Sequence, residues 1–96
     1  CPKEIELILD EQQAVVESAV IGVPHPDFGE SLVAVLVQKP NEKIDVKSLS
    51  TNLGAALARF KQPRAYFIVE ALPRNTMAKV QKNILREIYK DIFINP

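Results

Sequence analysis

Two apolar stretches on either side of a short loop constrain the fold of this chain more than any other feature. Val15–Val23 is rich in β-branched residues, and Ser31–Gln38 contains the unbroken apolar run Leu32–Val37. Both stretches are typical of β-strands. Between them, Pro24–Glu30 holds two prolines and a glycine, which predicts a turn. Because the second stretch is apolar without alternation, we expect that strand to be covered on both faces or to lie centrally.

Apolar residues at helical spacing predict two helices around these strands. The first is expected at about residues 2–12, where Pro2 suits an opening turn and Ile5, Ile8 and Leu9 fall on one face. The second is expected to begin after Asp45, a residue type that caps helices, and to end before Lys61-Gln62-Pro63. Its predicted buried stripe consists of Leu49, Leu53, Ala56 and Leu57.

The rest of the chain predicts a third strand at Ala65–Val69, a polar loop at Leu72–Lys79 and a last helix. That helix is marked by the apolar residues Val80, Ile84, Leu85, Ile88 and Ile92. Its outer side is expected to carry the polar residues Lys82, Arg86, Glu87 and Lys90. The order α-β-β-α-β-loop-α indicates an α+β domain. We expect a small, mostly antiparallel three-stranded sheet with helices packed on it.

The length of 96 residues allows one domain, 1–96. A domain of this size buries only about 60–65% of its unfolded surface, so it cannot enclose both a large substrate pocket and a nucleotide site. Any catalytic role would then contribute to a site completed elsewhere. The chain starts at Cys1 without a methionine, in what reads as the first turn of a helix, so we expect it to be part of a longer protein.

Charge and composition narrow the class of protein. Twelve basic residues balance twelve acidic ones, which argues against a nucleic-acid-binding protein. Cys1 is the only cysteine, so an intrachain disulfide is impossible, and a reducing, cytoplasmic location is expected. The longest apolar run is far shorter than the roughly 20 residues of a membrane span, and we expect no signal peptide.

Familiar catalytic motifs are nearly absent. One histidine and one cysteine cannot build a zinc site, and neither common glycine-rich nucleotide motif occurs. Asp27-Phe28-Gly29 spells a kinase tripeptide, but every other kinase element is missing. His25 could carry a proton, yet without a visible partner it is better interpreted as a structural or exposed residue. Asp27 and Glu30 are expected to bind backbone N–H groups of their own loop.

One segment, Leu72–Lys82, does carry candidate chemistry. It brings Arg74, Lys79 and Lys82 near one another, with Asn75 and Thr76 between them. A lysine on a flexible stem can reach an anion on another surface. The alternative is a basic loop that is simply solvated, as charge runs usually are.

These residues resemble a known signature. Pro73–Lys82 resembles the last motif of the adenylate-forming enzyme superfamily, Pro-Arg-x-x-x-Gly-Lys-[IV]-x-[RK]. Three other stretches are similar to the same family in order and spacing: Pro2–Glu6 to the helix after its hinge, Ala19–Glu30 to its "AVIGVPHPDxGE" strand and loop, and Phe60–Pro63 to its "[YF]K.P" turn. Within the superfamily, residues 72–86 look closest to bacterial malonyl-CoA synthetases.

One residue departs from the motif, because Ala78 stands where the family has glycine. If that glycine is needed for a positive φ, alanine costs roughly 1–2 kcal/mol locally. If the glycine only makes room for a close approach, the methyl group is tolerated.

The resemblance implies a C-terminal lid domain of an AMP-forming acyl-CoA synthetase, inactive as an isolated fragment. Lys79 would be the catalytic residue, supported by Pro73, Arg74 and Ala78; no residue is assigned to coenzyme A. ATP and Mg²⁺ would be bound mainly by an N-terminal adenylation domain, with coenzyme A and an acid, malonate for this subfamily, as the other substrates. Pro73, Ala78 and Lys79 also resemble the sequence that a bacterial lysine acetyltransferase reads.

Two alternatives stay open beside this interpretation. The first is another acyl- or aryl-CoA ligase, or an adenylation domain that loads a carrier protein. The second is a non-catalytic α+β interaction module.

Overall fold

The computed structural model describes residues 2–57 and 61–95. Its elements confirm the predicted α+β class and element order. They are α1 (Pro2–Asp10), β1 (Val15–His25), β2 (Gly29–Gln38), α2 (Val46–Leu57), β3 (Ala65–Val69) and α3 (Lys82–Tyr89). Cys1, and Phe60 of the predicted Phe60–Pro63 turn, lie outside the described residues.

The three strands form one sheet in the order β1-β2-β3. β1 and β2 pair antiparallel, with Val20 opposite Ala34. β2 and β3 pair parallel, with Val33 opposite Ala65, because the chain crosses over through α2 before it returns to the sheet. The sheet is therefore mixed, with its longer pairing antiparallel, and β2 is the central strand.

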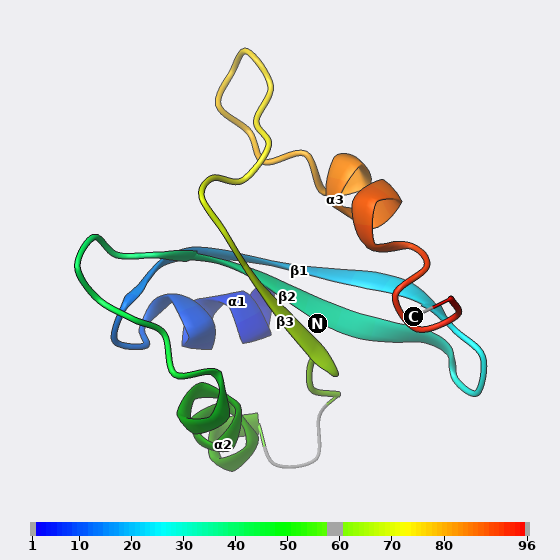
Figure 1. Cartoon of the computed structure of the whole chain (residues 1–96), viewed down its shortest axis with the longest axis horizontal. Helices are drawn as coiled ribbons and strands as arrows, with labels where there is room; N and C mark the ends of the chain where they lie inside the picture. The colour runs from blue at the N-terminus through cyan, green and yellow to red at the C-terminus, as the bar shows by residue number, and fades with distance from the viewer. Residues whose placement is uncertain (1, 58–60, 96) are drawn as a thin grey trace.

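Helices cover both faces of the sheet: α1 and α2 lie on one side and α3 on the other (Figure 1). Side chains alternate between the faces, as the pleat requires. Val20, Ala34 and Leu36 pack toward α1 and α2, whereas Ile21 and Val35 pack toward α3. Every residue from Val33 to Leu36 is fully buried, which confirms a central strand covered on both sides.

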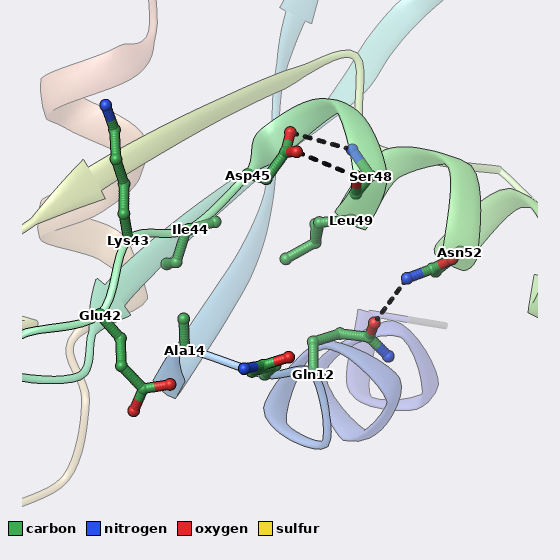
Figure 2. Close-up of a pocket in the computed structure, with 10 residues that line it drawn as sticks. Gln12, Ala14, Glu42, Lys43, Ile44, Asp45, Ser48, Leu49 and Asn52 are labelled. Carbon is green, nitrogen blue, oxygen red and sulfur yellow. Dashed lines mark hydrogen bonds between the residues drawn. The ribbon is translucent and has the colours of Figure 1, made fainter.

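Asp45 caps α2 as predicted. Its carboxylate accepts hydrogen bonds from the backbone N–H groups of Lys47, at 3.1 Å, and Ser48, at 3.2 Å. The hydroxyl of Ser48 donates to the same carboxylate, at 3.0 Å (Figure 2). These bonds, the Ser48 backbone bond foremost, hold the pKa of Asp45 below its usual value. The helix therefore begins where the sequence predicts.

At three positions the prediction of a buried side chain is wrong. Ala56 is exposed, although Leu49, Leu53 and Leu57 of the same stripe are buried. On α3, Ile84 and Ile88 are 43% and 62% exposed. This short helix packs on the sheet through Leu85 and Tyr89, whose ring stacks on Phe67. Its other apolar side chains face away because only one face of a helix can meet a sheet.

Candidate active-site loop

The segment between β3 and α3 extends away from the sheet as a narrow loop (Figure 1). Arg74 and Val80 form an antiparallel bridge at its base. The N–H of Asn75 donates to the carbonyl of Lys79 at 3.0 Å. Below this pair, the N–H of Gln81 donates to the carbonyl of Pro73 at 2.8 Å. The loop is thus a small hairpin, and Lys79 lies beside the paired residues at its base.

Asn75 orders the tip of this hairpin. Its side-chain oxygen accepts hydrogen bonds from the N–H groups of Met77, at 3.0 Å, and Lys79, at 2.9 Å. Its carbonyl accepts a third from the N–H of Ala78, at 3.0 Å. Sequence reasoning counted Asn75 only as a polar neighbour of the cations. The signal that could have identified it is the tendency of asparagine to bind the backbone two residues ahead.

Arg74 connects the loop to the body of the domain. One guanidinium nitrogen, Nη1, donates to the carbonyl oxygen of Ala78 at 2.6 Å. The other, Nη2, pairs with the carboxylate of Glu17 on β1. The structure therefore places Arg74 against the residue that precedes Lys79. Sequence reasoning missed Glu17, which lies 57 positions earlier in the chain.

Ala78 has a φ of +66°, within the left-handed region. This finding answers the question raised by the missing motif glycine: the position requires positive φ, and alanine adopts it at a local cost of roughly 1–2 kcal/mol. The hydrogen bonds to the Ala78 carbonyl and N–H offset part of that cost. The loop therefore adopts the backbone conformation that glycine favours, with alanine at this position.

Lys79 is exposed, and within residues 2–57 and 61–95 its side chain makes no ion pair or hydrogen bond. Lys82 differs, because its ammonium pairs with the carboxylate of Glu6 at 2.7 Å and is only 31% exposed. An open hollow beside the loop is lined by Asn75, Lys79, Val80, Gln81, Lys82, Asn83 and Arg86. The lining contains no carboxylate, so it does not fit a magnesium ion, which prefers anionic oxygen ligands. It fits an anion.

The loop between β1 and β2 is built differently. The ring of His25 stacks on Phe28, with centroids 4.6 Å apart, and lies 5.2 Å from the ring of Phe93. Its Nδ1 accepts a hydrogen bond from the N–H of Asp27 at 3.1 Å. The histidine therefore has a structural role in this loop.

The prediction for the two acidic residues of that loop is wrong. In the described part of the chain, neither Asp27 nor Glu30 accepts a hydrogen bond from a backbone N–H through its carboxylate. The ring of His25 accepts the backbone N–H of Asp27 instead. The side chain of Glu30 instead lies across Gly22, where an added Cβ would come within 2.2 Å of Oε1.

A second hollow lies between the end of α1, the turn after β2 and the start of α2 (Figure 2). Four of its polar side chains are already engaged in pairs. Asp45 binds Ser48, and the side-chain amide of Asn52 donates to Gln12 at 3.4 Å. The Ser48 hydroxyl is engaged by the carboxylate that caps α2, so Lys79 remains the candidate for chemistry.

Two other kinds of site are absent from the described residues. None of the helices in residues 2–57 and 61–95 is long and apolar enough to cross a membrane. Across those same ranges, His, Cys, Asp and Glu side chains form no cluster of three or more that could hold a metal ion.

The chain is similar to known proteins over most of its length. Residues 4–79 match the family model of the AMP-binding enzyme C-terminal domain. The chain is 42% identical over 85 residues to a 4-chlorobenzoate–CoA ligase of Arthrobacter sp, covering 88% of this chain and 16% of that protein. It is 39% identical over 88 residues to the long-chain-fatty-acid–CoA ligase FadD13 of Mycobacterium tuberculosis, covering 92% and 17%.

A solved structure shows the same fold. Apo MatB from Rhodopseudomonas palustris superposes with a TM-score of 0.91 at 55% identity, covering 96% of this chain and 18% of that protein. The chain thus spans less than a fifth of the length of each of these proteins. The family match covers most of the chain and runs from α1 to Lys79. This chain belongs to the AMP-binding enzyme C-terminal domain family, whose homologues include acyl-CoA ligases.

Proposed function

We propose that residues 1–96 are the C-terminal lid domain of a cytoplasmic AMP-forming acyl-CoA synthetase, in which Lys79 promotes formation of the acyl-adenylate. One observation carries the proposal above all. Lys79 is an exposed cation without an ion-pair partner in the described chain, yet its backbone is held by hydrogen bonds on both sides. Such a lysine is presented to something outside the domain.

The chemistry of the first half-reaction explains why a lysine is needed. A substrate carboxylate attacks the α-phosphate of ATP, forming a C(O)–O–P bond and releasing pyrophosphate. The two reacting groups are both anionic and repel each other. An ammonium about 4 Å from each attracts each by roughly 4 kcal/mol at an effective dielectric of 20, before desolvation. Lys79 has the compact charge and the reach for this position.

The second half-reaction needs a different arrangement. The thiol sulfur of coenzyme A attacks the acyl carbon, and AMP departs with its negative charge. An ammonium placed for the first step has no equivalent task in the second. The proposal therefore includes a rotation of the lid between the steps, which withdraws Lys79, as mobile lids do in other enzymes. Magnesium and most contacts to ATP are assigned to the N-terminal domain, outside this chain.

Malonate is the proposed acid. Residues 72–86 resemble bacterial malonyl-CoA synthetases, and the identity to MatB exceeds the identities to the two ligases compared above. Those ligases are named for 4-chlorobenzoate and for long-chain fatty acids, so closely similar lid domains serve different acids. A thioester assay of the complete protein with malonate, aryl and fatty acids tests the choice. Preference for an aryl or fatty acid, or transfer to a carrier protein, would favour the alternative ligases.

The main test separates the two half-reactions in the complete protein. Lys79→Ala is expected to slow acyl-adenylate formation by about 10²–10³, the range for one lost electrostatic donor. Starting from supplied acyl-adenylate and coenzyme A, the same variant is expected to form thioester within about tenfold of the normal rate, because Lys79 is then withdrawn. Lys79→Arg is expected to rescue poorly, since a planar fork does not replace a point charge.

Thermal unfolding of each variant provides the control for a general defect. Equal loss in both half-reactions at unchanged Tm would contradict the assigned role of Lys79. Acetylation of Lys79 by a protein lysine acetyltransferase removes the same charge, so the acetylated protein is expected to lose the same half-reaction. Isolated residues 1–96 are expected to form no acyl-adenylate, because the nucleotide and acid pockets belong to the other domain.

A further inference from the structure

We propose that Glu17 on β1 is a positioning residue that sets the orientation of Lys79 through Arg74. The inference rests on the proposed function, since it concerns how the loop prepares Lys79 for adenylation. Glu17 touches no substrate in this scheme. It acts through contacts that begin in the sheet and end at the peptide bond preceding the lysine.

The peptide group between Ala78 and Lys79 is held at both of its edges. Its carbonyl oxygen accepts a hydrogen bond from Nη1 of Arg74 at 2.6 Å. Its N–H donates to the side chain of Asn75 at 2.9 Å. Because a peptide group is planar, fixing both edges fixes its plane. The N–H of Asn75 also holds the next peptide group through the Lys79 carbonyl, so the two planes together set the direction in which the Lys79 Cα presents its side chain.

Two residues bind the peptide group between Ala78 and Lys79. Asn75 does so from within the loop, whereas Arg74 is itself anchored by a residue outside the loop. Nη2 of Arg74 pairs with the carboxylate of Glu17, while Nη1 of the same guanidinium faces Ala78. Hydrogen bonds between charged groups are stronger than neutral ones, and the rigid guanidinium transmits the orientation from one end to the other. Without the carboxylate, the guanidinium, whose side chain is 39% exposed, is free to turn toward water.

A β-bulge between Val15 and Glu17 directs the side chain of Glu17 toward the loop between β3 and α3. The register between β1 and β2 shifts at this point, with Val15 opposite Gln38 and Glu17 opposite Val37. In a regular strand, residues two apart share a face. Here the extra residue lets Val15 bury on the α1 and α2 side, while Glu17 follows the parity of Ala19, which packs on the α3 side. Bulges are known to redirect side chains in this way.

A second ion pair holds the other end of the loop. Lys82, the first residue of α3, pairs with Glu6 of α1 at 2.7 Å. The same Glu6 oxygen accepts the N–H of Val20 at 2.7 Å, on the edge strand β1. The start of α3 is thus fixed independently of Glu17. Removing Glu17 is therefore expected to loosen the loop without releasing the helix.

The experiment measures both half-reactions in the complete protein with Glu17→Gln, which keeps the shape of the side chain and removes its charge. Adenylation is expected to slow by about fivefold, the upper range for one partly exposed ion pair. Thioester formation from supplied acyl-adenylate is expected to stay within about twofold, with Tm close to the parent value, because the lysine is withdrawn in that step. Glu87→Gln is the matched control, because it removes the exposed Glu87–Lys90 pair of α3 and is expected to change neither step.

A double-mutant cycle distinguishes positioning from a separate effect. If Glu17 acts through Lys79, then Glu17→Gln added to Lys79→Ala is expected to cost less than about twofold more in adenylation, since coupled residues are not additive. Arg74→Lys gives a second route that does not alter β1. Lysine can pair with Glu17 but cannot also reach the Ala78 carbonyl, so the same adenylation-specific loss is expected.

Three outcomes would overturn the inference. The first is normal adenylation by both Glu17→Gln and Arg74→Lys while Lys79→Ala is impaired, which leaves the proposed function standing. The second is a full cost of about fivefold for Glu17→Gln in the Lys79→Ala background. The third is normal adenylation by Lys79→Ala itself, which overturns the proposed function and the inference together.

Discussion

The loop between β1 and β2 and the loop between β3 and α3 are held in different ways. In the loop between β1 and β2, side chains pack on one another: His25 stacks on Phe28, contacts Phe93 and accepts the N–H of Asp27. In the loop between β3 and α3, side chains hold the backbone instead. Asn75 and Arg74 bind peptide groups, and the tip residue Met77 is 86% exposed.

This difference separates a structural loop from a candidate catalytic one better than residue type does. His25 is the residue with the more familiar catalytic chemistry, yet its ring is engaged within the loop. Lys79 has simpler chemistry, but its backbone is fixed and its ammonium is exposed. A residue can act on a partner surface only if the fold positions it without using up its functional group.

Removing the backbone support of the second loop is expected to have the largest effect. Asn75→Ala deletes two hydrogen bonds to backbone N–H groups, each with a net value of about 0.5–1.5 kcal/mol. If that energy orders Lys79 for the reaction, adenylation by the complete protein slows by roughly 5- to 100-fold. Stopped-flow or quench measurement of acyl-adenylate formation checks this value.

The matched control for that change lies in the first loop. Asp27→Ala also removes a polar loop side chain, but one whose carboxylate accepts no hydrogen bond in the described part of the chain. It is expected to leave adenylation within about twofold, as an exposed side chain with no structural partner does. Equal losses for Asn75→Ala and Asp27→Ala would erase the distinction between the loops.

His25→Ala is expected to change turnover of the complete protein by less than about tenfold, a barrier change below roughly 1.4 kcal/mol. The substitution removes the stacking on Phe28 and the bond to Asp27, so its effect should fall on the loop and on the segment around Phe93. Steady-state kinetics and hydrogen exchange measure the two parts. A loss of several hundredfold with the fold intact would mean that the histidine takes part in the reaction.

Apart from the Asp27→Ala control, Ala78→Gly is expected to have the smallest effect. Glycine relieves the roughly 1–2 kcal/mol cost of positive φ but adds about 0.5–1 kcal/mol of chain entropy, so the loop gains at most about 1.5 kcal/mol. Slower hydrogen exchange of the Lys79 amide, with adenylation within about threefold, is the expected result. A large rise in activity would show that the methyl group of Ala78, rather than its backbone conformation, limits the parent protein.

Much of this molecule followed from local sequence. The apolar run at Leu32–Val37 predicted a strand covered on both faces, and β2 is that strand. Asp45 predicted the start of α2 through its hydrogen bonds to the next turn. The four stretches with the spacing of a known family predicted the family itself. These features depend on residues close to one another in the chain, where spacing and residue type leave few alternatives.

Tertiary structure decided what depends on distant partners. Ile84 and Ile88 have the helical spacing of core residues, but α3 turns them away from the sheet. Glu17 looks like any surface carboxylate until the fold brings Arg74 to it across 57 positions. The positive φ of Ala78 depends on this pairing in part, because Arg74, which donates to the Ala78 carbonyl, is itself anchored by the distant Glu17. Local sequence specifies periodicity and turns, whereas which face is buried and which charges meet is set only when the elements pack together.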